Sequence, residues 1–210
     1  MALTKTSDKF ICYNGPLEND DKHGHVRIKI GVSGAAETGH CGLNALDMAK
    51  ALGAEVIRQG GILVTGATTG FPLWASMGAK EERGVVIGLS PAASPKEHIE
   101  GYHLPLDYTD LIIYTGFGFP GRDLLFTRSC EALLIGCGRI GTIHEFTIAF
   151  EDNKPIGVLE GPWTMAEQIK DMVAKGNRQG DRIIYDSDPK KLVERLVAMV
   201  EEDRKKVDIH

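Results

Sequence analysis

From residue 27 onward, short apolar segments alternate with longer amphipathic ones. The apolar segments are rich in β-branched residues, which predicts strands at 28–33, 62–65, 85–89, 111–114, 132–135, 155–159 and 183–185. Between them, apolar positions recur at mostly helical spacing, which predicts helices at about 43–59, 73–83, 122–129, 143–150, 165–175 and 189–206. The stretch 90–110 holds three prolines and predicts an irregular connection.

This alternation predicts an α/β fold. Short strands that are apolar on both faces are typical of a parallel sheet covered by helices on each side. We therefore expect a single doubly wound, Rossmann-like domain over 27–210, with a mostly parallel sheet of about seven strands and right-handed connections. Residues 1–26 are polar and irregular, and we interpret them as a variable N-terminal arm.

Composition and charge narrow the classes of partner. The chain is 42% hydrophobic and 25% charged, as in an ordinary globular protein, and its net charge is −5. This acidic balance argues against a nucleic-acid partner, which needs a basic face. No apolar run approaches the roughly 20 residues that span a bilayer, so we expect no membrane partner.

The cysteines indicate a compartment. Cys12, Cys41, Cys130 and Cys137 are scattered and form no C-x-x-C spacing. This pattern predicts neither a structural zinc site nor a disulfide framework, and it fits a reducing cytoplasm. We also expect no other metal site, because the spacing of the histidines and acids in 97–103 matches no regular ligand set.

The predicted strand ends carry small residues. Ligands of open α/β sheets bind beyond the carboxyl ends of the strands. There the chain places Gly34, Gly66, Ser90, Gly116 and Gly136, with Gly70 in the loop after the second strand. Glycine also suits strand-to-helix turns for conformational reasons alone. Their coincidence on one predicted edge nevertheless indicates a ligand site.

The segment 131–145 has the parts of a phosphate-binding loop. An apolar strand is followed by a glycine-rich turn that contains Gly138 and Gly141, and Thr142 opens the next helix. Glycines let the backbone approach an anion, and the first N–H groups of a helix point toward it. Glu145 follows within one turn. A phosphate site with a carboxyl group beside it suggests chemistry on a nucleotide.

The same segment allows two other interpretations. Thr142 and Glu145 match the capping box S/T-x-x-E, in which both side chains serve the helix itself. The pattern Gly136-x-Gly138-x-x-Gly141 also fits a dinucleotide fingerprint, with Glu160 placed to bind a ribose. Four predicted strands precede this pattern, however, whereas the fingerprint usually opens its domain.

A second charged group lies one strand earlier. Arg122 and Arg128 flank the predicted helix 122–129, and Arg122 faces the ligand edge at its start. Arg122 is a candidate for bidentate contact with a phosphate or carboxylate. The alternative is a surface arginine that pairs with Asp123 or Glu131. His144 is interpreted as a structural or exposed helix residue.

These motifs resemble those of the LOG-type Rossmann family, long labelled possible lysine decarboxylases. The family includes phosphoribohydrolases that release cytokinin from its riboside 5′-monophosphate. Residues 137–145 match its motif P-G-G-x-G-T-x-x-E, and Gly121-Arg122-Asp123 matches its earlier arginine element. The resemblance implies a nucleotide 5′-monophosphate site in a homodimer or higher homo-oligomer. Gly138, Gly141 and Thr142 would hold the phosphate, and Arg122 and Glu145 would form the catalytic pair.

The chain also departs from that motif. Arg139 replaces the second glycine, Cys137 replaces proline, and Asp123 stands where the hydrolases have lysine. Arg139 would contact the phosphate itself or close the site. These departures are similar to those of a subgroup near the molybdenum-cofactor carrier proteins, which bind a phosphorylated pterin without turnover.

Three hypotheses follow. The leading one is a nucleotide 5′-monophosphate binding protein, with hydrolysis of the N-glycosidic bond as the candidate reaction. The alternative is a non-catalytic binder or carrier of a phosphorylated cofactor such as molybdopterin. An NAD-type oxidoreductase is third. We expect no bound cofactor and no lysine decarboxylase activity, because no lysine lies beside the glycine-rich turn.

Overall fold

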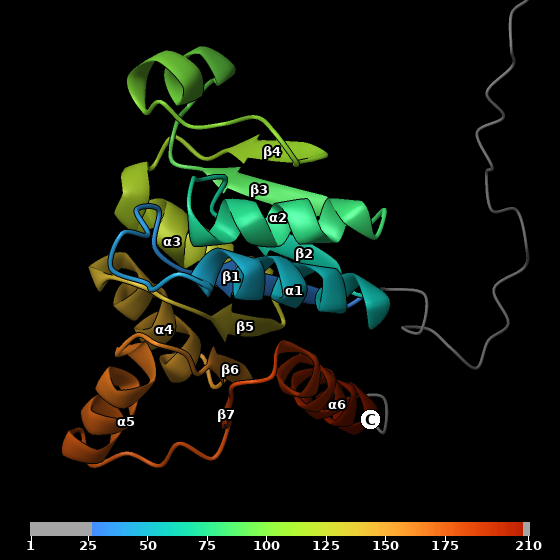
Figure 1. Ribbon diagram of the computed structural model, residues 1–210, viewed down its shortest axis with the longest axis vertical. Coiled ribbons are helices and arrows are strands. Elements are labelled where there is room, and N and C mark those ends of the chain that lie inside the picture. Colours follow the sequence, from blue (N-terminus) through green and yellow to red (C-terminus); the bar gives the residue numbers. More distant parts are fainter. Residues whose placement is uncertain (1–26, 208–210) are drawn as a thin grey trace, which may run out of the picture.

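A computed structural model describes residues 27–207, and the predicted arm 1–26 lies outside the described residues. Seven strands form one sheet in the order β4-β3-β2-β1-β5-β6-β7, and every neighbouring pair is parallel (Figure 1). This confirms the predicted doubly wound α/β fold. The strands are β1 Lys29–Ser33, β2 Ile62–Thr65, β3 Val86–Ser90, β4 Leu111–Tyr114, β5 Ala132–Ile135, β6 Ile156–Leu159 and β7 Ile183–Asp186.

Helices connect these strands and cover the sheet. They are α1 Ala45–Arg58, α2 Phe71–Glu81, α3 Gly118–Ser129, α4 Ile140–Glu151, α5 Met165–Lys175 and α6 Pro189–Val207. Helix α1 packs on α2 and α6, whereas α3 packs on α4. Figure 1 shows the first group in front of the sheet and α3 and α4 behind it.

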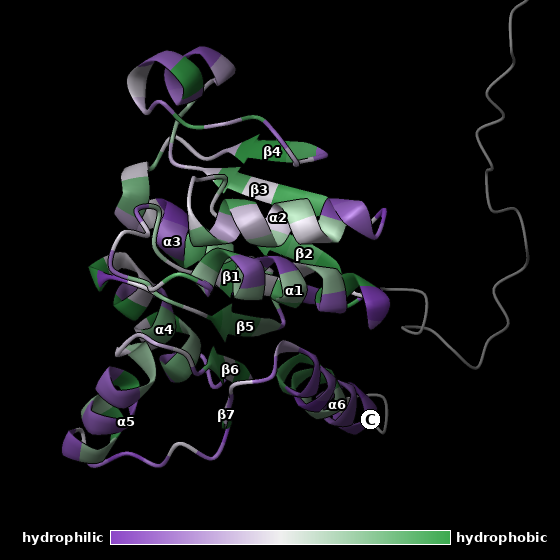
Figure 2. Cartoon of the chain, in the orientation of Figure 1, coloured by the Kyte–Doolittle hydropathy of each residue, from purple (hydrophilic) through white to green (hydrophobic). Residues whose placement is uncertain are grey.

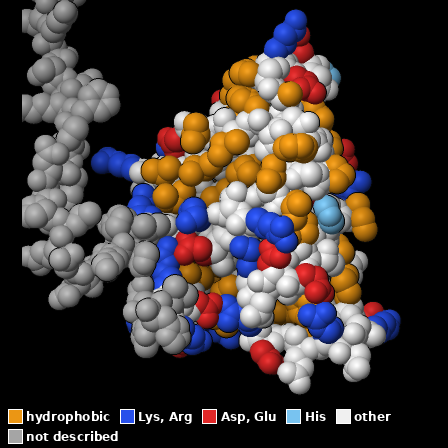
Figure 3. All heavy atoms as spheres, turned by 180° about the vertical axis from the view of Figure 1, so that it is seen from behind, with side chains coloured by type: hydrophobic (Ala, Val, Ile, Leu, Met, Phe, Trp, Pro, Cys, Tyr) orange, Lys and Arg blue, Asp and Glu red, His pale blue; other side chains and the backbone are white. Residues whose placement is uncertain are grey.

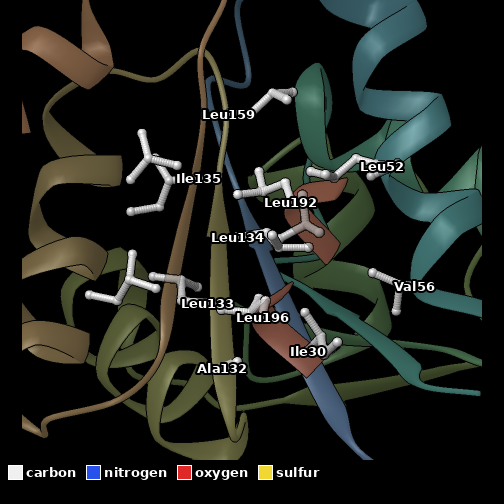
Figure 4. Packing of buried hydrophobic residues seen from close by; sticks show 14 of the residues in the cluster. Ile30, Leu52, Val56, Ala132, Leu133, Leu134, Ile135, Leu159, Leu192 and Leu196 are labelled. Atoms are coloured by element: carbon white, nitrogen blue, oxygen red, sulfur yellow. The ribbon is translucent and has the colours of Figure 1, made fainter. Parts of the chain in front are cut away.

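The sheet has apolar side chains on both faces. Figure 4 shows Leu134 of β5 beside Leu192 of α6, while its neighbours Leu133 and Ile135 lie on the other side of the strand. All four residues of β5 are buried. In Figure 2 the strands are largely green, while purple gathers at helix ends and outer surfaces. Such burial on both faces is the physical reason for the short, continuous apolar runs in the sequence.

The strand order reverses between β1 and β5. From β1 the chain moves outward through β2 and β3 to β4, and α3 then brings it back to β5 on the other side of β1. In open α/β sheets, such a switch point leaves a crevice beyond the carboxyl ends of the two strands. The ends of β1 and β5, at Ser33 and Ile135, therefore frame the expected ligand site.

The helix starts differ from the predicted ones. Helix α3 begins at Gly118, so Arg122 lies in its second turn and not at its start. Helix α4 begins at Ile140, two residues before the predicted start at Thr142. Within 90–110, which was predicted irregular, the segment Glu97–Gly101 forms one π-helical turn.

The expectation that no disulfide forms is wrong for one pair. Cys41 and Cys137 are joined by a disulfide across 96 residues, while Cys130 is a free, buried thiol. Cys41 follows β1 and Cys137 follows β5, and these two strands are neighbours in the sheet. Spacing along the chain contains no sign of this proximity, which the strand order creates.

None of the helices within 27–207 combines the length and the apolar character that crossing a bilayer requires.

Candidate functional site

A cleft of about 380 Å³ lies at the switch point. Its walls come from the ends of β1 and β2, from α3 and from the start of α4. Of the residues singled out in the sequence, the cleft brings together Gly34, Gly66, Arg122, Arg139, Gly141, Thr142 and Glu145. The carboxyl edge of the sheet thus holds both the predicted glycine-rich turn and the predicted charged residues.

The start of α4 opens onto this cleft. Ile140 and Gly141 are exposed at the first turn of the helix, where backbone N–H groups have no intrahelical acceptor. A Cβ atom added at Gly141 would meet nothing within 4 Å. Packing therefore does not require glycine at this position. Its absence of a side chain leaves room for a ligand against the first-turn amides.

Arg139 stands at the mouth of the cleft. Its guanidinium donates to the carboxylate of Glu37 at 2.6 Å, and both side chains are exposed. Exposed ion pairs of this kind contribute little to stability, so the pair can separate at small cost. Arg139 is therefore available to an anion that enters the cleft.

Arg122 is held differently, in the wall of the cleft. It is buried, donates to the carbonyl oxygen of Gly66 at 2.6 Å, and forms an ion pair with Asp123 at 3.1 Å. A Cβ atom at Gly66 would lie 1.4 Å from an Arg122 nitrogen, so any larger residue at this position would displace the guanidinium. The guanidinium also lies 5.8 Å from the ring centre of Phe119. Arg122 is thus engaged by the protein itself.

Glu145 is buried at the floor of the cleft. The hydroxyl of Ser33 donates a short hydrogen bond to its carboxyl group. Burial raises the pKa of Glu145 to about 8, the Arg122 guanidinium opposes this rise, and the Asp123 carboxylate adds to it. Asp123 is also bonded to Nδ1 of His144 at 3.0 Å. At neutral pH the Glu145 carboxyl therefore keeps its proton and can act as a hydrogen-bond donor.

The other predicted glycines have structural reasons for their identity. Added Cβ atoms at Gly34 and Gly136 would both collide with the ring of Phe71. Gly70 and Gly116 have positive φ angles and do not line the cleft. Gly138 accommodates the Thr142 side chain and lines the neighbouring cleft with Arg139.

One competing interpretation fails on geometry, and another holds in part, because Arg122 does pair with Asp123, although both are buried and not on the surface. In α4 the Thr142 hydroxyl accepts from the backbone N–H of Arg139, which precedes the helix, and Glu145 bonds to Ser33. The predicted capping box between Thr142 and Glu145 is therefore wrong. Arg128 lies outside the cleft, pairing with Asp152 and not with Glu131.

The dinucleotide interpretation gains nothing from the structure. Glu160 is bonded to Lys170 at 2.6 Å and does not line the cleft. The glycine pattern follows the fifth strand, β5, and not the first.

Sequence reasoning missed Ser33 as a partner of Glu145, and Thr68 in the cleft wall. It noted Asp123 as a departure from a motif and as a possible partner of Arg122, but not as a partner of His144, to which this carboxylate is also joined. The position of Ser33 at a predicted strand end was the one available signal.

Comparisons with known proteins agree with this fold. The model of the SLOG cluster4 family matches residues 27–193. An uncharacterized protein of Archaeoglobus fulgidus is 29% identical over 135 residues, which are 64% of this chain and 82% of that protein.

Two solved structures are also similar. The molybdenum cofactor binding protein of Rippkaea orientalis is 26% identical with a TM-score of 0.69, and the match covers 83% of this chain and 98% of that one. The molybdenum cofactor carrier protein of Chlamydomonas reinhardtii is 28% identical with a TM-score of 0.66, and the match covers 82% and 99%. The family match spans most of the sequence, and the chain belongs to the SLOG cluster4 family.

Proposed function

We propose that this protein binds a phosphorylated, ring-bearing small molecule of the molybdopterin type in the switch-point cleft and carries it without chemical turnover. The observation that supports this most directly is the open first turn of α4. There Gly141 lines the cleft, and no neighbouring protein atom fills the space where a side chain would lie. Two similar structures, those of a molybdenum cofactor binding protein and a molybdenum cofactor carrier protein, support the same ligand class.

The phosphate group would lie against the first-turn amides of α4. The helix dipole favours an anion there, and Arg139 can leave Glu37 to form charge-assisted hydrogen bonds with the phosphate oxygens. Apolar groups of Val32, Pro72 and Phe119 line the rest of the cleft and suit a flat ring. The cleft thus has a polar end and an apolar end, as such a ligand does.

Two features support binding without turnover. The charges of Arg122 and Asp123 are paired with each other in the wall. The Glu145 carboxyl is neutral at pH 7 because burial raises its pKa to about 8. A neutral carboxyl gives little stabilisation to the oxocarbenium-like cation that forms when an N-glycosidic bond breaks.

Hydrolysis of a nucleoside 5′-monophosphate is the second candidate function. The proton held by Glu145 is the observation that favours it, since a buried acid in a cleft can protonate a leaving base. Arg122 and Glu145 would then act as the catalytic pair. An NAD-type oxidoreductase has no comparable support.

Calorimetry on the purified chain tests the ligand class. The probes are a phosphorylated pterin, a nucleoside 5′-monophosphate and inorganic phosphate, each organic ligand beside its unphosphorylated counterpart. We expect the phosphorylated pterin to bind about 10- to 100-fold more tightly than the unphosphorylated one. Equal affinity for the two would contradict a phosphate site.

Turnover is measured separately. The nucleoside 5′-monophosphates are incubated with the wild-type chain and with Glu145→Gln, and free base and ribose 5-phosphate are quantified. We expect no release above the level of the variant. Release by the wild-type chain alone would replace the carrier proposal with the hydrolase.

Self-association is part of the proposal. Leu111 and Ile113 of the edge strand β4 and Leu124 and Leu125 of α3 are all exposed. Figure 3 shows hydrophobic side chains gathered over the upper part of the rear face of the molecule. A patch of exposed apolar side chains is a common feature of protein interfaces. Light scattering should show a homo-oligomer that Ile113→Lys dissociates.

A cytoplasmic location stays a prediction.

A further inference from the structure

The imidazole of His40 lies beside the disulfide between Cys41 and Cys137. Nε2 of His40 lies 3.7 Å from the sulfur of Cys41 and 3.5 Å from the sulfur of Cys137. These three side chains bring one imidazole and two sulfur atoms within 4.8 Å of one another. Both cysteines are buried, whereas His40 is exposed and lines a second cleft of about 560 Å³.

The nitrogen–sulfur distances match those in a metal centre. Zinc binds cysteine sulfur at about 2.3 Å and histidine nitrogen at about 2.0–2.1 Å in a tetrahedron, which places nitrogen and sulfur ligands about 3.6 Å apart. Only the two sulfur atoms must separate, to about 3.8 Å in the same geometry. The Cα atoms of the two cysteines are 5.6 Å apart, so side-chain rotation is sufficient.

We propose that His40, Cys41 and Cys137 form a binding site for one thiophilic divalent ion of the Zn²⁺ class, which is open when the disulfide is reduced and closed when it is formed. The site does not depend on the ligand proposed for the switch-point cleft. It adds a metal centre where the sequence predicted none, because its ligands come from segments that are distant along the chain.

The site opens when the disulfide is reduced and the ion replaces the protons of the two thiols. An external phosphine supplies the two electrons that break the sulfur–sulfur bond and is oxidised to its oxide, while one water molecule supplies the oxygen and the two protons, and two thiols result. The ion then forms two bonds to sulfur and one to Nε2 of His40, and the two thiol protons pass to solvent. Two thiolates and one divalent cation sum to zero charge, which suits the burial of both sulfur atoms.

The fourth coordination position faces the second cleft. Since the cysteines are buried and His40 lines that cleft, a water molecule or a ligand can approach the ion only from this side. The carbonyl oxygen of Gly138, 3.3 Å from Nε2, is also near the open position. Two cysteines, one histidine and an open position are a ligand set that zinc uses in catalytic sites.

The centre would also hold a loop of the first cleft. Across 36–44, Cys41 is the one buried residue, so its side chain is the buried attachment of a loop whose other side-chain contacts, such as that of Glu37 with Arg139, are exposed. The loop begins at Ala36, which lines the switch-point cleft. Both the disulfide and the metal ion would keep this buried attachment, whereas the reduced, metal-free chain would lose it.

Cobalt titration tests the site. The full chain carries Cys12→Ser throughout, since Cys12 lies outside the described residues. It is reduced with a phosphine, freed of metal, and titrated with Co²⁺ while the thiolate-to-cobalt absorption is recorded. We expect saturation at one equivalent, displacement by Zn²⁺, and no band in the oxidised chain until the phosphine is added.

Variants identify the ligands. Cys41→Ser and Cys137→Ser should abolish the thiolate band or weaken binding more than about 100-fold, and His40→Ala should weaken it without affecting folding, because His40 is exposed. Cys130→Ala is the matched control, since it removes the free buried thiol and should leave the titration unchanged. The proposal fails if the reduced chain shows no band, or if the band survives in Cys41→Ser.

Discussion

The switch-point cleft has two charged regions that are built differently. In its inner wall, Arg122, Asp123 and Glu145 are buried, and Ser33 and Gly66 provide their polar partners. At its mouth, Arg139 and Glu37 form an ion pair whose members are 57% and 81% exposed. The charged groups of the inner wall are bonded to one another and to buried neighbours, whereas the exposed pair at the mouth can exchange partners.

This difference separates structure from recognition. A buried charge that loses its partner is strongly destabilised, so the inner network is fixed by folding. An exposed pair contributes little to stability, so the outer arginine can change partners when a ligand arrives. We therefore expect substitutions in the inner region to affect stability first, and substitutions at the mouth to affect affinity alone.

The largest effect is expected for Arg122→Ala. This change leaves the Asp123 carboxylate buried without its cation, which costs about 3–5 kcal/mol in the free energy of unfolding. Urea denaturation measures it. Arg128→Ala is the matched control, because Arg128 forms an exposed pair with Asp152 and its loss should cost no more than about 0.5 kcal/mol. Equal losses in both variants would remove the distinction between the two regions.

A pH dependence is expected from Glu145. The pKa of its carboxyl is about 8 in the folded protein and near 4.5 when unfolded, so the folded state binds a proton that the unfolded state releases between these values. The free energy of unfolding therefore falls as pH rises through this window and levels off above about pH 8. At about 1.36 kcal/mol per pKa unit, the change is on the order of a few kcal/mol.

Glu145→Gln isolates this contribution. The amide is neutral at every pH, so the variant should lose the part of the slope between about pH 5 and 8 that Glu145 causes, and gain stability relative to the wild type at pH 9. Glu160→Gln, at an exposed ion pair, serves as the control and should follow the wild-type curve. Parallel curves for the wild type and Glu145→Gln would show that the buried carboxyl does not hold a proton in this window.

The fold could be predicted from the sequence because burial of the strands determines both the fold and the pattern of apolar residues along the chain. Strands covered on both faces must be apolar throughout, and this produced the segments that were recognised as strands. Arg122, Glu145 and Gly141 could be selected because they lie in one motif or at one predicted edge.

The sequence could not show contacts between segments that are distant along the chain. The bond from Ser33 to Glu145 and the disulfide from Cys41 to Cys137 both depend on β1 lying beside β5, which only the strand order determines. The start of α4 was misplaced for a local reason. Thr142 is a good N-cap residue, but it lies within the first turn, and its hydroxyl accepts from the backbone N–H of Arg139, the residue before the helix.

A smaller effect, on affinity, is expected for Arg139→Ala. Losing its charge-assisted contact should weaken binding of the phosphorylated pterin about 10- to 100-fold, while the free energy of unfolding changes by less than about 0.5 kcal/mol. Calorimetry and urea denaturation measure the two quantities. Arg128→Ala again serves as the control and should bind normally. If Arg139→Ala binds as the wild type does, the mouth of the cleft takes no part in recognition.

Gly141→Ala is expected to change stability only slightly, and the direction of that change makes it informative. Alanine stabilises a helical position relative to glycine by about 0.5–1 kcal/mol, and the added Cβ meets no protein atom within 4 Å. The variant should therefore unfold at a slightly higher temperature. The same methyl group occupies space beside the first-turn amides, so affinity for inorganic phosphate should fall. Greater stability with weaker binding would place the anion at this turn, whereas greater stability with unchanged binding would move it elsewhere in the cleft.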